Sequence, residues 1–341
     1  MRKRRLLAWL LIGLCMASYR ASAEPEQKIY HLFGTTMGNK YAISWAADPT
    51  SAKQVHELRL KVEHRLEQLN ASMSTWREDS EINAINNAPA NQPIRLSDEL
   101  LWVVSEAHRI GLMTDGALDI TIGPLIDLWG FGPKGLPGRL PTPQEVARVK
   151  AHTGPETFTL AAGQLSKTSD HTRLDLSSIA KGYGVDALGQ LLESNGIHHY
   201  LVEIGGEIVA RGQRPDGRPW TVAVVNPAPT RLAATTLIPL TDMAVATSGD
   251  YHHYFESQGT RFSHVIDPQS GRAVQTQIVS ATVIAPQCAT ADGLATAAMV
   301  MGVEDMLRLA ESQQLAVMLI EDHFGQVRVH RSRAFEQLLR P

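Results

Sequence analysis

The sequence predicts an α+β protein with mixed sheets and flanking helices. Its 341 residues are 43% hydrophobic and 20% charged, which fits a folded globular chain and excludes a disordered or collagen-like one. Apolar residues alternate with polar ones in some segments and recur every three or four positions in others, so both strands and helices are expected. Several predicted strands are neighbours in hairpins, which favours α+β over regular alternation. We find no internal repeat and expect one domain over residues 24–341.

The first half of the chain is expected to start with two strands and then to become mainly helical. Strands over residues 28–33 and 40–45 flank a glycine-containing turn. A helix follows, in which apolar residues recur at spacings of three and four: Val55, Leu58, Val62, Leu66 and Leu69. Ser97 is expected to cap a second helix, and Thr142–Glu145 reads as a capping box with proline at the first helical position.

The second half is expected to alternate between strands and helices. Arg173–Leu176 reads as a short strand, followed by a helix that Ser177 or Ser178 caps and that ends at Asn195. Further strands are expected at residues 200–204, 208–211, 221–225, 244–247, 279–285, 316–321 and 326–330. Two further helices are expected, one starting near residue 291 and one over residues 304–312.

The first 23 residues have the composition of an export signal. Residues 1–5 are basic, Leu6–Ser18 is an apolar run of 13 residues, and Ala21–Ala23 supplies small residues in the A-x-A pattern. The apolar run is short for a membrane span, although a retained signal anchor is the alternative. We therefore predict a cleaved signal peptide over residues 1–23.

Cysteine content and charge narrow the classes of function further. Cys15 would make the protein an inner-membrane lipoprotein if it were acylated, but Leu14 is a poor match to the small residue that a lipobox requires. Cleavage after Ala23 would leave one thiol, Cys288, and 27 basic against 35 acidic residues, a formal charge of −8. This negative charge argues against a nucleic-acid partner, because nucleic-acid binding needs a basic surface.

Four segments carry residue types that could support chemistry. Asp292 and Thr296 are four apart on a predicted helix, so their oxygens share a face and suit Mg²⁺. The alternative is an aspartate favoured by the helix dipole beside a packed threonine. Ser177–Gly184 combines hydroxyls, a lysine and a helix start, as in a phosphate cradle or an ordinary helix cap. His264 follows a predicted strand, and 114–119 is a loop with two aspartates.

The common catalytic motifs find no support in the sequence. It contains no G-x-S-x-G, H-E-x-x-H or C-x-x-C segment, and residues 130–135, which fit G-x-G-x-x-G, belong to a Gly/Pro-rich connection rather than to a turn between a strand and a helix. Common nicotinamide, hydrolase and zinc-protease classes therefore lose their usual support.

Eight segments in order resemble one family, the ApbE-type FAD:protein FMN transferases. The resemblance covers about residues 30–330 and implies an ApbE-like fold. The matching segments read FGTTMGNKY, MSTWREDSEI, TDGALDITIGPLIDLWGFG, RLDLSSIAKGYGVD, YLVEIGGEI, ATSGDY, FSHVIDPQSG and ATADGLATA. The resemblance implies Mg²⁺-dependent cleavage of FAD, transfer of FMN to a Thr or Ser hydroxyl of a target flavoprotein, and release of AMP.

The resemblance also assigns residues to the reaction. Mg²⁺ would lie between the Ala180 carbonyl, Asp292 and Thr296, with the Ala295 carbonyl as a further ligand. His264 would be the acid/base or phosphate-orienting group, together with the metal ligand Asp292 in the catalytic set. The flavin, ribityl and phosphate groups of FAD would be bound by Met37, Trp76, Ala117, Leu118, Asp119, Ser178, Lys181 and Ile266.

Some positions depart from the family pattern. Asn39 stands where Thr is common, and Trp76 where Tyr is common, while Leu118 and Ile120 replace Phe and Pro. A tryptophan keeps a stacking face and loses the phenolic oxygen. These changes concern packing of the flavin ring and leave the metal and phosphate residues matched.

The same residues leave other functions and partners open. A Mg²⁺-dependent FAD pyrophosphatase would use the same metal site, and a non-catalytic periplasmic FAD-binding protein is the third alternative. The resemblance implies a periplasmic location and a target with a D-x-x-[ST]-G-A-[ST] segment. Such targets are membrane redox subunits of sodium-pumping quinone reductases (Nqr), Rnf-type complexes or NosR-like proteins.

Overall fold

The computed structural model describes residues 27–135, 139–224, 236–249, 254–257, 260–323 and 325–340. The predicted signal peptide therefore lies outside the described residues. The elements are, in chain order, β1 (Lys28–Thr36), β2 (Asn39–Ala47), α2 (Ala52–Met73), α3 (Glu81–Asn87), β3 (Ile94–Arg95), α4 (Asp98–Met113), α5 (Gly123–Trp129), α6 (Pro143–Lys150), η1 (Pro155–Thr157), β4 (Phe158–Ala161), β5 (Gln164–Lys167), α7 (Ala180–Ser194), β6 (Tyr200–Ile204), β7 (Glu207–Arg211), β8 (Trp220–Val224), β9 (Thr236–Leu240), β10 (Met243–Gly249), β11 (Tyr254–Ser257), β12 (Thr260–Ser263), β13 (Ile266–Asp267), β14 (Arg272–Ala273), β15 (Ile278–Ala285), α8 (Cys288–Met301), α9 (Val303–Gln313), β16 (Ala316–His323), β17 (Gln326–Arg331) and α10 (Arg333–Leu338).

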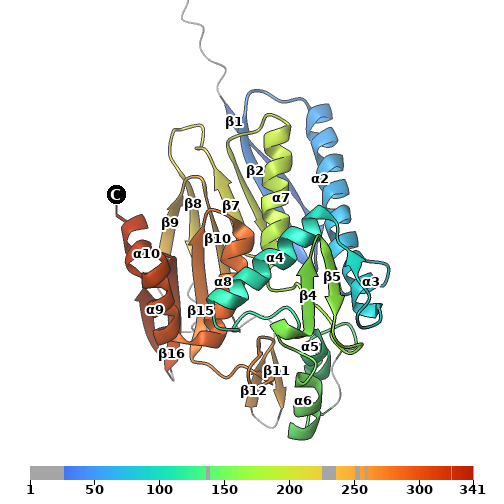
Figure 1. Cartoon of the computed structure of the whole chain (residues 1–341). Helices are drawn as coiled ribbons and strands as arrows, with labels where there is room; N and C mark the ends of the chain where they lie inside the picture. The colour runs from blue at the N-terminus through green and yellow to red at the C-terminus, as the bar shows by residue number, and fades with distance from the viewer. Residues whose placement is uncertain are drawn as a thin grey trace, which may run out of the picture.

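A twisted sheet of eight strands forms the centre of the molecule (Figure 1). The strand order is β1-β2-β6-β7-β10-β15-β16-β17. Every ladder between these strands is antiparallel, and the parallel pairing found among the described residues is a single bridge between Ile122 and Arg173. Helices and sheets together confirm the predicted α+β class.

Each face of this sheet packs against a different layer. Val317 and Leu319 on β16 point into the core shared with helices α2, α7 and α8, while Met318 and Ile320 point the other way. The three helices lie side by side across their face (Figure 1). The opposite face is covered by the β8–β9 hairpin and by α10, which buries Phe335. The alternation follows from the two-residue period of a strand.

Smaller units extend the molecule beyond the helical layer. Strands β3, β5 and β4 form a three-stranded sheet near α3 and α4. Below it in Figure 1, α5 and α6 lie near the β11–β12 hairpin. The β13–β14 hairpin joins α5 and α6 in a separate apolar cluster that includes Leu125, Val146 and Ile266. Among the described residues, no helix is long and apolar enough to cross a membrane.

Two local predictions before α7 are wrong. Arg173–Leu176 forms no strand, because the side-chain amide of Asn86 takes the place of a partner strand. The Leu174 N–H donates to Asn86 Oδ1 at 2.6 Å, and Asn86 Nδ2 donates to the Leu174 carbonyl at 2.9 Å. Helix α7 starts at Ala180 after Ile179, with no side-chain cap from Ser177 or Ser178. The short elements, such as α3, α5 and β13, were not predicted, since so few residues show no clear period.

Candidate active site

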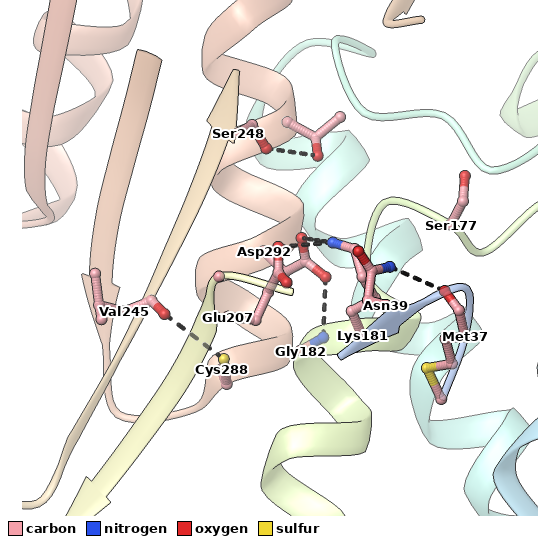
Figure 2. A network of polar contacts seen from close by, with 12 residues as sticks. Met37, Asn39, Ser177, Lys181, Gly182, Glu207, Val245, Ser248, Cys288 and Asp292 are labelled. Carbon is pink, nitrogen blue, oxygen red and sulfur yellow. Dashed lines mark hydrogen bonds and ion pairs between the residues drawn. The ribbon is translucent and has the colours of Figure 1, made fainter. Parts of the chain in front are cut away.

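Asp292 lies in the second turn of α8 and faces the start of α7. Its Oδ2 accepts a hydrogen bond from the Gly182 N–H at 3.0 Å, and the residue is 2% exposed (Figure 2). Gly182 permits this contact, because a Cβ there would lie 2.5 Å from the Cys288 carbonyl oxygen. The helix-dipole alternative for Asp292 is therefore wrong, since the residue is past the first turn of the helix and bonds to another helix.

The first turn of α8 is instead capped by Asp186 of α7. Asp186 Oδ1 accepts from the Cys288 N–H, and Oδ2 accepts from the Ala289 N–H, both at 2.9 Å. Burial raises the pKa of Asp186 to about 6, while these two hydrogen bonds oppose the rise. Asp186 was not predicted, because a cap supplied from a distant segment leaves no local pattern in the sequence.

Lys181 and Glu207 complete a buried charge cluster with Asp292. Lys181 Nζ lies 2.6 Å from Glu207 Oε1 and 3.6 Å from Asp292 Oδ1. Glu207 is 2% exposed, and its second oxygen, Oε2, is buried with no hydrogen-bond partner among the described residues. Figure 2 shows the three side chains converging from α7, β7 and α8. When both carboxylates are ionised, they outweigh the single ammonium and leave an excess of negative charge that attracts a cation.

Glu207 was also missed at the sequence level. It starts β7 directly after a hairpin turn at Gly205 and Gly206, both of which have positive φ. Such turns favour glycine. The turn sets the register of the two strands and thereby the face of the sheet on which each side chain lies. The available signal was an acidic residue on each side of this turn, Glu203 and Glu207, in two mainly apolar strands.

The protonation equilibria of the cluster reflect burial and mutual attraction. Burial raises the pKa of the Asp292 carboxyl, and Lys181 and the Gly182 N–H oppose that change. Burial also raises the pKa of Glu207 to about 7, again against the opposing charge of Lys181. Burial by itself would lower the pKa of Lys181, but the two carboxylates raise it above its ordinary value.

The other predicted metal ligands lie on the same two helices. Thr296 is one turn beyond Asp292, and its hydroxyl is 3.3 Å from Ser248 Oγ on β10. Ala180 begins α7 and Ala295 lies between Asp292 and Thr296, and both are buried. In the described part of the chain, no three His, Cys, Asp or Glu side chains form a metal-binding group. The predicted donors are oxygens of a carboxylate, a hydroxyl and backbone carbonyls, the ligand types that a hard cation such as Mg²⁺ prefers.

Two turns next to the cluster position Met37. Met37 has a φ of +49°, and the Asn39 side-chain amide donates to the Met37 carbonyl at 2.9 Å. The Gly205 N–H donates to the Lys40 carbonyl at 3.2 Å, so the β1–β2 and β6–β7 turns touch. Asn39, one of the departures from the family pattern, thereby supports the strained turn that presents Met37 (Figure 2).

Trp76 and Ser178 lie on loops that a carboxylate ties together. Asp175 accepts from Thr75 Oγ1 at 3.3 Å and from the Ser177 N–H at 2.8 Å. Trp76 is 68% exposed, which is unusual for a large aromatic side chain, and Ser178 is half-buried. The loop residues therefore offer an aromatic face and a hydroxyl close to the start of α7.

The loop after α4 is held by hydrogen bonds within the loop and by packing against α8. Ala117 and Leu118 are buried, and the Leu118 side chain packs at Gly293 of α8. Asp119 Oδ1 accepts from the Thr121 N–H at 2.8 Å and from Thr121 Oγ1 at 2.7 Å. Burial raises the pKa of Asp119, and the hydrogen bonds from Thr121 oppose that rise.

The segment with His264 joins the same loop from the other side. Gln269 Nε2 donates to the Asp115 carbonyl at 3.1 Å. The His264 ring is half-buried and meets the Phe131 ring edge-on, with centroids 6.4 Å apart. Ile266 is 2% exposed and its side chain belongs to the apolar cluster around α5. The structure thus brings together Asp292, Lys181, Ala180, Ala295 and Thr296, and places Trp76, Asp119 and His264 on surrounding loops.

The comparisons with known proteins cover most of the chain and point to one family. The ApbE family model matches residues 37–319. A Vibrio cholerae protein named FAD:protein FMN transferase is 41% identical over 329 residues, which cover 96% of this chain and 98% of that protein. A Haemophilus influenzae protein of the same name is 41% identical over 316 residues, or 91% of each chain. The solved structure of the flavin transferase ApbE from V. cholerae matches with a TM-score of 0.85 and 41% identity, covering 92% of this chain and all of that one.

Proposed function

The chain belongs to the ApbE family, and on that premise we propose how it acts as an FAD:protein FMN transferase. The acceptor hydroxyl oxygen bonds to the phosphorus of the FMN half of FAD. The bond from that phosphorus to the bridging oxygen breaks, AMP leaves with this oxygen, and the hydroxyl proton passes to a base. The buried cluster of Asp292, Lys181 and Glu207, at the junction of α7 and α8, carries the proposal, because it supplies charge for a cation and a pyrophosphate.

We propose that Mg²⁺ is held by Asp292, Thr296 and the carbonyls of Ala180 and Ala295. The placement of all four residues on α7 and α8 supports this assignment. When bound, the ion would offset negative charge on the pyrophosphate and on the transferring phosphoryl group. Lys181 adds a fixed positive charge beside this position, at the start of α7 where a phosphate is also favoured by the helix dipole.

The proposed FAD contacts surround this cluster. Met37, Trp76, Ala117, Leu118, Asp119, Ser178, Lys181 and Ile266 make up that set. The exposed Trp76 supplies a face for the flavin ring, and Ser178 supplies a hydroxyl for phosphate or ribityl oxygen. The Leu118 and Ile266 side chains are committed to packing, so we assign their contacts to the backbone.

We propose His264 as the group that accepts the proton of the acceptor hydroxyl. An imidazole can do this near neutral pH, and its loop lies next to the proposed flavin contacts at 117–119. Asp267 is a weaker candidate, because its carboxylate already accepts from the Gln269 and Ser270 N–H groups. Asp250, another alternative, lies outside the described residues.

The decisive experiment measures AMP and flavin-labelled protein together. The enzyme is incubated with FAD and Mg²⁺, with and without a target domain carrying a D-x-x-[ST]-G-A-[ST] segment. A transferase gives AMP and covalent flavin only when the target is present. AMP at the same rate without target would identify a pyrophosphatase, and FAD binding with no AMP in either arm would identify a binding protein.

The location of the protein and the identity of its acceptor proteins are also part of our proposal. We propose export to the periplasm, supported by the basic, apolar and small-residue order of residues 1–23. The acceptors would then be periplasm-facing segments of membrane redox subunits of the Nqr, Rnf or NosR-like kinds.

A further inference from the structure

Glu207 is not among the residues that we propose to contact the metal or FAD. Burying its carboxylate nevertheless costs a large free energy of desolvation. A carboxylate inside a protein loses its hydration, and Glu207 recovers part of this loss through one short contact with Lys181. In the part of the chain that the structure describes, its Oε2 atom has no hydrogen-bond partner. Buried polar atoms without partners are rare in native proteins, so an unused one next to a site calls for an explanation.

The two contacts of Lys181 differ in kind. The 2.6 Å contact with Glu207 is a charge-assisted hydrogen bond, whereas 3.6 Å to Asp292 is too long for one. Asp292 Oδ1 is therefore held by the ammonium only as a looser ion pair, without a hydrogen bond, while Oδ2 accepts from the Gly182 N–H. Without Glu207, the ammonium would have Asp292 as its nearest carboxylate, and the two would form a neutral pair.

We infer that Glu207 is a positioning residue that binds the Lys181 ammonium and thereby keeps Asp292 available to a divalent cation. This inference rests on the magnesium site proposed above. Glu207 also makes the cluster negative by one charge when both carboxylates are ionised, so that a cation is attracted rather than excluded. Lys181 stays close enough to act on a phosphate but does not compete for the Asp292 oxygen.

The test is a double-mutant cycle in metal binding, measured without FAD. Mn²⁺ alone serves as the oxygen-preferring probe, and its affinity is followed by electron paramagnetic resonance at pH 7.5. Glu207→Gln should weaken Mn²⁺ binding by about 10–100-fold, the usual cost of losing a group that orients a metal ligand. Lys181→Met should bind Mn²⁺ at least as tightly as wild type. In the Lys181→Met background, adding Glu207→Gln should cost only a small part of its effect in wild type.

Controls separate this inference from the metal site itself. Glu203→Gln is the matched control, since Glu203 lies on the neighbouring strand β6 and its carboxylate accepts from the Gly206 N–H rather than from Lys181. Circular dichroism checks that each variant is folded, and Glu207→Asp, with the same charge, should recover part of the affinity.

Unchanged Mn²⁺ affinity in Glu207→Gln overturns the inference while leaving the metal site intact. An equal loss in the presence and absence of Lys181 also overturns it, because Glu207 would then act on the metal directly. Wild-type affinity in Asp292→Ala would overturn the proposed metal site as well.

Discussion

At the scale of single residues, we expect the chemistry to depend on Asp292, which is both the proposed metal ligand and the acceptor for the Gly182 N–H. Asp292→Asn keeps an oxygen for that N–H and removes the charge. We expect the rate of FMN transfer at fixed Mg²⁺ to fall by at least about 100-fold, since metal stabilisation of a phosphoryl group amounts to several kcal/mol. Steady-state transfer assays over a Mg²⁺ series measure this.

The Asn variant also controls for folding. Asp292→Ala would leave the buried Gly182 N–H unpaired, at a cost of about 1–3 kcal/mol, so loss of activity there has two explanations. In Asp292→Asn the Lys181–Glu207 pair is retained, and thermal unfolding should stay close to that of wild type. Full activity of Asp292→Asn at ordinary Mg²⁺ would exclude the metal role.

A substitution of His264 tests whether this residue accepts the proton of the acceptor hydroxyl. His264→Ala should lower the maximal transfer rate by about 10²–10⁴-fold, the usual contribution of general-base catalysis, while FAD still binds. Single-turnover transfer to a fixed target domain gives the rate, and flavin fluorescence gives FAD affinity. A weaker FAD affinity with a saturated rate near wild type would make His264 a binding residue.

At the scale of elements, the close approach of α7 and α8 places the site. Gly182→Ala would put a Cβ 2.5 Å from the Cys288 carbonyl oxygen, where backbone must move. We expect a loss of stability of about 1–3 kcal/mol, as for other overpacked positions, measured by urea unfolding. The matched control is Gly184→Ala on the same helix, where the nearest atoms are flexible side-chain ends of Ile204 and Met37 at 3.3 Å. Equal effects of the two substitutions would argue against this interpretation.

Asp186 links the same two helices through the cap of α8. Asp186→Ala should cost about 1–2 kcal/mol, because two N–H groups lose their acceptor. The pKa of Asp186 is raised to about 6, so its folded form holds the proton more tightly than the unfolded chain does. Its contribution to stability is therefore largest at low pH and is lost as pH rises through about 6.

The pH dependence of Asp186 is best measured against a variant that cannot titrate. Between pH 7 and pH 5, the stability of wild type relative to Asp186→Asn should rise by about 1 kcal/mol. Urea unfolding of both proteins at the two pH values measures this difference. A relative stability that falls on acidification would show that the hydrogen bonds at the helix start outweigh burial.

At the scale of the whole molecule, the proposed export would decide which form of the chain carries the activity. We expect the mature protein to begin at Glu24, because the small residues Ala21 and Ala23 fit a signal-peptidase site. Mass spectrometry of the protein recovered from the periplasm gives the N-terminus. A chain that begins at an acylated Cys15 would instead make the protein a lipoprotein.

Long periodic segments allowed the fold to be predicted well. Helix α2 and strand β6 follow the expected segments, because each buries one clear face of its own. Strands β16 and β17 also follow the expected segments within a few residues, although β16 is buried on both faces and β17 is mostly exposed. The short pieces were not predicted, and the expected strand at 173–176 was wrong, since the side chain of Asn86 satisfies its backbone from 88 residues away.

The sequence by itself determined the α+β class, the family and the helix-face pair Asp292 and Thr296, because these depend on local periodicity and on motif order. Only the tertiary structure decided that Lys181 lies between Glu207 and Asp292, that Asp186 caps α8, and that Gly182 lets two helices touch. Each of these contacts joins residues that are distant in the chain. Breaking these contacts costs more free energy because the groups are buried. Burial is a property of the packed molecule rather than of any single segment.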